Sequence, residues 1–146
     1  MVQYPGLRPI CYRRHGMDRS RLRVAVIDDD ESVRKALKRL LRAASLDADT
    51  FASGGEFLHS LTAQLPDCIV LDLHMPGMNG LDVQQQLARS GLRVPIVVIT
   101  GHDEPQARAQ CLSAGAAAYL RKPLDDEALL DAIHRAAGVA RPSLSD

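Results

Sequence analysis

The sequence has no tryptophan, only 3% aromatic residues and no net charge at neutral pH. Its 18 basic and 18 acidic residues balance, which gives no electrostatic reason to expect nucleic acid or an acidic membrane as a partner. No apolar run approaches the roughly 20 residues that span a bilayer, and the first residues lack the apolar core of a signal peptide. We therefore expect a cytoplasmic protein without membrane contact and without direct binding of nucleic acid by this chain.

The few cysteines and histidines show no metal-binding spacing. Cys11, Cys68 and Cys111 are odd in number, lie far apart and include no CxxC pair, which is typical of reduced thiols. The five histidines show neither HxxxH nor HExxH spacing. These absences argue against a disulfide framework and against a zinc site.

Segments of two kinds alternate five times along the chain. Short apolar runs typical of strands occur at residues 22–27, 48–52, 68–71, 95–99 and 118–121. Helical periodicity follows each run, at residues 31–44, from 53 or 54, 81–90, 105–114 and 125–137. The first, third and fourth runs are apolar throughout, which indicates central parallel strands buried on both faces. The pattern predicts a doubly wound, five-stranded parallel α/β sheet in the order 2-1-3-4-5.

The two ends of the chain lack this alternation. Residues 1–21 contain Pro5, Gly6 and several arginines without periodicity, so we expect a flexible basic extension. Residues 22–137 form the predicted folded domain. Residues 138–146 form a short tail, whose Pro142 and two serines fit a linker as well as a plain C-terminus.

Polar side chains follow four of the five predicted strands. Because the carboxyl ends of parallel strands meet at one edge of a sheet, these side chains should share one crevice. Mg²⁺ binds carboxylates, waters and a phosphate oxygen, and a carboxylate beside it can attack phosphorus. The side chains and the backbone groups beside them are those of Asp28, Asp29, Asp30, Asp72, Thr100, Gly101, Lys122 and Pro123.

Each of these residues also has an ordinary structural explanation. An acid such as Asp30 commonly caps a helix, and an aspartate such as Asp72 commonly ends a strand. Thr100 suits a strand, and most lysines are simply solvated. Lys122 precedes a proline, where a cis bond would aim its side chain inward. The conjunction at the right strand ends favours a site for a divalent cation and a phosphoryl group.

Four segments together resemble a known family. VAVIDDDESVRKAL, IVLDLHMPGMNGLDV, PIVVITGH and AGAAAYLRKP follow the order and spacing of a response-regulator receiver domain over about residues 22–137. The resemblance is to the FixJ-like branch and implies the flavodoxin-like fold of the chemotaxis regulator. It also implies that Asp72 is the phosphoacceptor, that Thr100 and Lys122 bind the phosphoryl group and that Tyr119 is the switch aromatic. The implied Mg²⁺ ligands are Asp28, Asp29, Asp72 and the backbone carbonyl of His74, with Asp30, Gly101 and Pro123 in supporting positions.

The resemblance further implies a partner and an output. A histidine kinase or a histidine phosphotransfer protein would supply the phosphoryl group, and the chain would catalyse its own phosphotransfer and autodephosphorylation without being a turnover enzyme. The face formed by residues 105–114, 118–121 and 125–137 would then switch, and we predict a homodimer through it. FixJ-like members usually carry a helix-turn-helix domain, so the alternative is the receiver half of a DNA-binding regulator. A Mg²⁺-dependent phosphohydrolase would need a second acid at position 74, where this chain has a histidine.

Overall fold

The computed structural model describes residues 21–61 and 64–140. Five strands alternate with five helices along this part of the chain. The strands are β1 (Arg23–Ile27), β2 (Asp47–Phe51), β3 (Cys68–Asp72), β4 (Ile96–Thr100) and β5 (Ala118–Arg121). The helices are α1 (Glu31–Ala43), α2 (Gly54–His59), α3 (Gly80–Arg89), α4 (Pro105–Ser113) and α5 (Asp126–Ala136).

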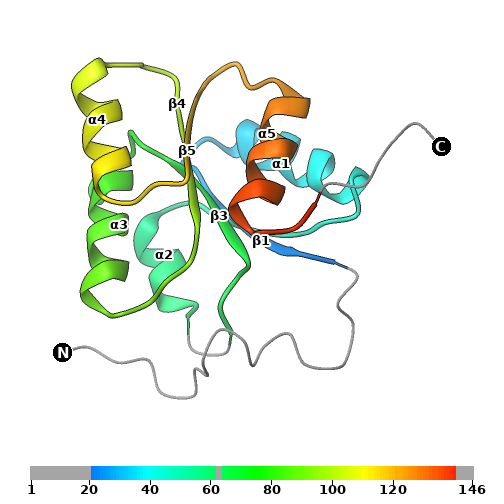
Figure 1. Ribbon diagram of the computed structural model, residues 1–146, viewed down its shortest axis with the longest axis horizontal. Helices are drawn as coiled ribbons and strands as arrows, with labels where there is room; N and C mark the ends of the chain where they lie inside the picture. Colours follow the sequence, from blue (N-terminus) through cyan, green and yellow to red (C-terminus); the bar gives the residue numbers. More distant parts are fainter. Residues whose placement is uncertain (1–20, 62–63, 141–146) are drawn as a thin grey trace.

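The strands form one parallel sheet in the order β2-β1-β3-β4-β5, as the sequence predicts. Helices α2, α3 and α4 cover one face of the sheet, and α1 and α5 cover the other (Figure 1). Each central strand therefore needs apolar side chains on both faces, which explains why β3 and β4 are buried along their whole length. This is the flavodoxin-like α/β architecture.

Two apolar clusters fill the space between the sheet and its helices. On one face, residues such as Ile27 and Leu71 pack against Phe57 of α2 and Val83 of α3. On the opposite face, β-strand side chains pack against α1 and α5, with Leu37, Leu41, Leu129 and Ile133 among the buried residues. The alternation of side chains along each strand sends neighbours to opposite clusters, so both layers are fixed by the same short runs.

The boundaries agree with the prediction to within about one residue. The second strand begins at Asp47, one residue before the predicted start. A charged residue at the start of an edge strand is also typical of a loop, so the sequence pattern does not include it. Asp47 is opposite Arg23 in the sheet register, and its carboxylate lies 3.4 Å from the guanidinium of Arg21. No helix in the described ranges is both long and apolar enough to cross a membrane. The predicted flexible extension lies almost wholly in residues 1–20, and most of the predicted tail lies in residues 141–146. Both ranges, and Cys11 with the first of them, are outside the described residues.

Gly80 shows how tightly the loop after β3 is packed. A β-carbon at Gly80 would lie 2.8 Å from the carbonyl oxygen of Asp72 and 2.9 Å from the Cα of Leu73. Both neighbours are backbone atoms that cannot move aside, so the first residue of α3 has to be glycine. The amide of Gly80 also donates to the carbonyl of Leu73 at 2.9 Å. These contacts hold the start of α3 directly against the end of the central strand.

Candidate phosphorylation and metal site

The strand register brings the predicted acids together at the carboxyl edge of the sheet. Ile27 pairs with Leu71, so the residues that follow them, Asp28 and Asp72, lie side by side on adjacent strands. Asp72 pairs in turn with Ile99 of β4, next to Thr100. β3 is the central strand of the sheet. Its last residue is therefore surrounded by side chains from both neighbouring strands.

Three carboxylates form one compact cluster in this crevice. Oxygens of Asp28, Asp29 and Asp72 all lie within 4.8 Å of one another. Asp28 is fully buried and Asp72 nearly so, whereas Asp29 is exposed at the mouth of the crevice. Oxygens around an octahedral Mg²⁺ with bonds of about 2.1 Å lie roughly 3–4 Å apart. The three side chains therefore offer the donor type that a small divalent cation takes, and they lie close enough together to be candidates for holding one ion.

Lys122 supplies the positive charge in this cluster. Its Nζ lies 2.9 Å from Oδ2 of Asp28 and 3.5 Å from Oδ1 of Asp72. Burial disfavours the ammonium, but the two carboxylates outweigh this effect and raise the pKa of Lys122. The Lys122–Pro123 peptide bond is cis. One ammonium faces three carboxylates, so the crevice carries an excess of negative charge without a cation.

The excess of negative charge shifts the protonation equilibrium of Asp72. Burial, reinforced by the nearby carboxylate of Asp28, raises the pKa of Asp72 from 3.8 to about 6, although Lys122 pulls it down. The nucleophilic form of a carboxyl group is the ionised one. A cation that neutralised the crevice would favour that form, because it would offset the repulsion that raises the pKa.

We expect Asp72→Asn to stabilise the metal-free domain at neutral pH. Because the pKa of Asp72 is higher in the folded domain than in the unfolded chain, protonated Asp72 favours folding. That contribution is complete below about pH 4 and is lost as the pH rises through about 6. Urea unfolding in EDTA should show the variant more stable than wild type by about 1–3 kcal/mol above pH 7. The two proteins should converge near pH 4, and a variant that is less stable at pH 8 would contradict the assigned charge excess.

Asp30, the third consecutive acid, has a different local role. Its Oδ1 accepts the amide N–H of Ser32 at 2.9 Å and the hydroxyl of the same residue at 2.8 Å. These bonds make Asp30 the N-cap of α1 and lower its pKa. Its own amide donates to Oδ1 of Asp28 at 2.9 Å. The capping explanation therefore accounts for Asp30, while Asp28 and Asp29 remain with the cluster.

The sequence also predicts Thr100, Gly101 and His74 at this edge of the sheet, and all three lie there. Thr100 is fully buried, and its hydroxyl both donates to the carbonyl and accepts from the amide of His102, each at 3.0 Å. A β-carbon at Gly101 would meet the Lys122 side chain at 3.8 Å, which is ordinary contact, so packing alone does not require glycine there. His74 is exposed, and its ring lies 5.9 Å from that of His102.

Tyr119 lies apart from the carboxylates, on the face of the sheet that α4 covers. Its partner in the register is Val98, two residues before Thr100, so both Tyr119 and Thr100 project toward the same layer. The tyrosine is 7% exposed and belongs to the cluster that includes Cys111 of α4. The predicted switch aromatic is therefore already buried in this structure.

One further residue contacts the site without any signal in the sequence. Arg34, in the first turns of α1, donates from Nη1 to the backbone carbonyl of Asp28 at 2.8 Å. This bond holds the backbone at the point where β1 ends and the loop of Asp28, Asp29 and Asp30 begins. An arginine four residues after a helix cap gives no sequence signal of this contact, because many solvated arginines occur at such positions.

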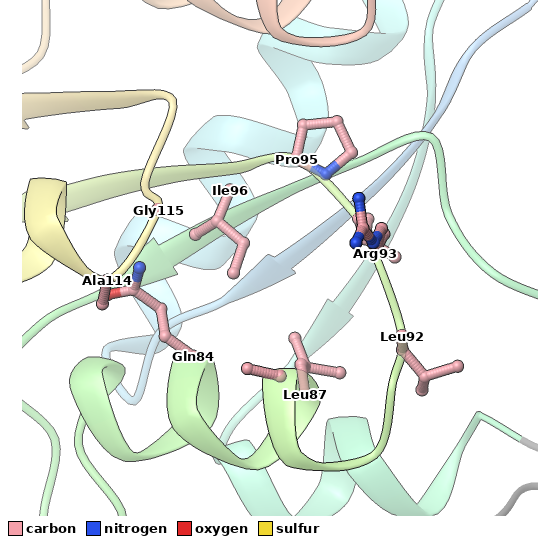
Figure 2. Close-up of a pocket in the computed structure, with 10 residues that line it drawn as sticks. Gln84, Leu87, Leu92, Arg93, Pro95, Ile96, Ala114 and Gly115 are labelled. Atoms are coloured by element: carbon pink, nitrogen blue, oxygen red, sulfur yellow. The ribbon is translucent and has the colours of Figure 1, made fainter.

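A separate hollow of about 470 Å³ lies at the other edge of the sheet. It is bordered by the α3 helix, the start of β4 and the turn after α4 (Figure 2). Gln84 and Arg93 are its polar lining residues, and its lining includes no carboxylate. The hollow is therefore distinct from the acidic crevice at the carboxyl ends of the strands.

Comparison with known proteins agrees with this geometry. Residues 24–134 match the response regulator receiver domain. The chain is 40% identical over 110 residues to nodulation protein W of Bradyrhizobium diazoefficiens, covering 75% of this chain and 48% of that protein. It is 37% identical over 139 residues to response regulator protein TodT of Pseudomonas putida, covering 94% and 60%. Transcriptional regulatory protein TdiR of Thauera aromatica is 38% identical over 118 residues, covering 81% and 52%.

Solved structures show the same fold. A response regulator receiver protein from Burkholderia phymatum is 46% identical, with a TM-score of 0.75 over 84% of this chain and 100% of that one. FixJ-N is 30% identical, with a TM-score of 0.76 over 84% and 98%. The chain spans about half to three fifths of the length of the curated relatives described above. It belongs to the response regulator receiver domain family, the receiver module of two-component phosphorelay systems.

Proposed function

We propose that this chain accepts a phosphoryl group on Asp72 from the phosphohistidine of a partner protein. The observation that carries the proposal is the contact of Lys122 with both Asp28 and Asp72, beside Asp29, at the carboxyl edge of the sheet. The family implies a cognate histidine kinase, and a histidine phosphotransfer protein could present the same group. The chemistry of the crevice suits such a donor because it places an ammonium beside a carboxylate nucleophile.

In the proposed reaction an oxygen of Asp72 attacks the phosphorus atom. A new O–P bond forms while the P–N bond of the phosphohistidine breaks, and the leaving imidazole nitrogen takes a proton from solvent. Lys122 pairs with the phosphoryl oxygens in place of one carboxylate, and its flexible stem permits that movement. When the signal ends, water attacks the phosphorus atom of the acyl phosphate, the O–P bond to Asp72 breaks, and inorganic phosphate leaves while the free carboxylate is restored.

The proposed cofactor is Mg²⁺, held by Asp28, Asp29, Asp72 and the backbone carbonyl of His74. When bound it supplies positive charge that offsets the negative charge of the carboxylates and of the incoming phosphoryl group. Asp29 is the more accessible of the two acids after β1, which favours it as the direct ligand. Asp28 is engaged by Lys122 and by the amide of Asp30, so it would act in part through these contacts.

The remaining residues have proposed roles in reading the phosphoryl group. The Thr100 hydroxyl would exchange its bonds with His102 for a bond to a phosphoryl oxygen, and Tyr119 would report this change to the surface. Asp30 supports the acidic loop as the cap of α1, and Gly101 and Pro123 shape the ends of β4 and β5. The output is a shift between two populations of the α4-β5-α5 face rather than a new fold.

Phosphorylation should depend on a divalent cation. Incubation with acetyl phosphate and Mg²⁺ should add one phosphoryl group, detected as a gain in intact mass that alkali removes. Excess EDTA should reduce the rate by at least about 100-fold, because the uncompensated crevice repels the phosphate. Readdition of Mg²⁺ beyond the chelator is the control. Undiminished phosphorylation in EDTA would contradict the proposed role of the metal. It would not bear on the identity of the acceptor, which the Asp72→Asn variant tests separately.

The proposal extends to the organisation of the chain. Residues 22–137 form the receiver, preceded by a basic extension at 1–21 and followed by a tail at 138–146, and the protein acts in the cytoplasm. Phosphorylation would favour a homodimer through the α4-β5-α5 face. Light scattering with Mg²⁺ and beryllofluoride, a phosphoryl mimic, tests this last point. An unchanged monomer mass would remove the dimer from the proposal.

One alternative has specific support. TdiR is by name a transcriptional regulatory protein, and the matched region covers 52% of its length. The same receiver would then serve as the phosphorylation half of a DNA-binding regulator whose output domain is absent from this chain. The sequence of the full gene decides between these readings, because a helix-turn-helix domain downstream would favour the regulator.

A further inference from the structure

Helix α4 is held to the rest of the domain by few side chains. Cys111 is its buried residue, and Glu104 at its N-cap position makes no side-chain capping bond. Near the C-terminal end of the helix, Nε2 of Gln84 donates to the carbonyl of Cys111 at 3.2 Å. Gln84 also lines the hollow between α3 and the turn after α4 (Figure 2). Each further contact between α4 and the rest of the domain therefore contributes to the position of the helix.

Such a contact joins the exposed side of α4 to β5. The guanidinium carbon of Arg108 lies 5.5 Å from the centroid of the Tyr119 ring. A cation over an aromatic face at this distance is attracted to the negative charge of the ring. Arg108 is exposed, whereas Tyr119 is 7% exposed. The arginine thus lies on the solvent side of a ring that is otherwise enclosed by the core.

The buried orientation of Tyr119 is a balance between opposing effects. Burial of the ring among apolar side chains favours it. The hydroxyl opposes it, since within the described residues this buried oxygen makes no hydrogen bond of good geometry, although the carboxylate of Asp103 lies nearby. Burial and the neighbouring carboxylate of Asp103 raise the pKa of the phenol, so the hydroxyl is neutral at physiological pH. A modest additional attraction on the ring face can therefore decide how often the ring is buried.

We infer that Arg108 is a positioning residue that holds the Tyr119 ring in its buried orientation and thereby couples the place of α4 to that of β5. The consequence of the Arg108–Tyr119 contact for signalling rests on the proposed function, in which a movement of Tyr119 transmits phosphorylation to the surface. The local contact itself does not depend on phosphorylation. An exposed cation–π contact changes a two-state population by about two- to fivefold. Loss of the cation should therefore expose Tyr119 by a comparable factor while the domain remains folded.

Hydroxyl-radical footprinting tests the contact directly, in metal-free protein without phosphodonor. The oxidation rate of Tyr119, measured by mass spectrometry of its peptide, should rise about two- to fivefold in Arg108→Gln. It should stay near the wild-type rate in Arg108→Lys, which keeps a cation at this position. Arg89→Gln is the matched control. It removes an exposed arginine of the neighbouring helix α3, on the same face of the sheet as α4, and it should leave the rate unchanged.

Three outcomes would overturn the inference. They are an unchanged rate in Arg108→Gln, an equal rise in Arg89→Gln, and an equal rise in Arg108→Lys. Circular dichroism of each variant shows whether the domain is folded, so a rise caused by unfolding would also count against the positioning role. Because the measurement contains neither metal nor phosphodonor, its failure leaves the phosphorylation of Asp72 untouched. Failure of the acetyl phosphate experiment, in turn, would not affect the exposure of the ring.

Discussion

Asp72→Asn is expected to reduce phosphorylation by acetyl phosphate at least about 100-fold, because it removes the attacking oxygen rather than an orienting contact. The hydrogen bonds of the crevice favour Asp72 over its neighbours as the nucleophile. Both oxygens of Asp28 are engaged, one by the amide of Asp30 and one by Lys122. Oδ1 of Asp72 lies 3.5 Å from Lys122. In the described part of the chain, its Oδ2 accepts no hydrogen bond and can attack.

Asp30→Asn is the matched control for this substitution. It also converts an acid of the same crevice region to an amide, but asparagine caps helices as well as aspartate does. The cap on Ser32 would therefore survive, and phosphorylation should stay within about twofold of wild type. Intact mass measured over time gives both rates. Continued labelling of Asp72→Asn, with the phosphoryl group mapped to Asp29 or elsewhere, would contradict the assignment of the acceptor.

The fold was predictable because the burial pattern of parallel strands is visible in the sequence. β1, β3 and β4 are short runs of branched apolar residues, and such runs occur where helices cover both faces of a sheet. The apolar pattern is weakest in the edge strand β2, because Asp47 and Asp49 interrupt it. Arg21 and Arg23 pair with these acids across the chain, and no local pattern reveals such tertiary pairs.

The site was predictable only as far as backbone position determines it. Strand ends and strand order place Asp28, Asp72 and Lys122 at one edge, whatever their side-chain rotamers. The bond of Thr100 with His102 and the bond of Arg34 with the carbonyl of Asp28 depend on rotamers and loop geometry. The contact of Arg108 with Tyr119 depends on how α4 packs. Sequence spacing carries no information on these choices.

The charge balance of the crevice links its stability to its chemistry. Three clustered carboxylates and one ammonium leave an excess of negative charge that raises the pKa of Asp72. Removing a negative charge and removing the positive charge should therefore change the stability of the metal-free domain in opposite directions. On the proposed function, such a site gives up part of its stability so that it can bind a cation and a phosphoryl group.

Lys122→Met should destabilise the metal-free domain by about 2–4 kcal/mol at pH 7, because it leaves the fully buried carboxylate of Asp28 without its cation. The loss falls below that of a fully buried pair, since 23% of the lysine side chain is exposed. Urea unfolding in EDTA measures it. Saturating Mg²⁺ should recover much of the lost stability, as the metal takes over the neutralisation of the carboxylates.

Lys35→Met is the matched control, since Lys35 pairs with Glu31 at 3.4 Å on the exposed surface of α1. Such a pair contributes little, so this variant should differ from wild type by less than about 0.5 kcal/mol. In the Asp72→Asn background, Lys122→Met should cost less than in wild type, because one of the two carboxylates that the lysine compensates is gone. Equal losses for Lys122→Met and Lys35→Met, or a loss that Mg²⁺ deepens, would show that Lys122 does not neutralise the crevice.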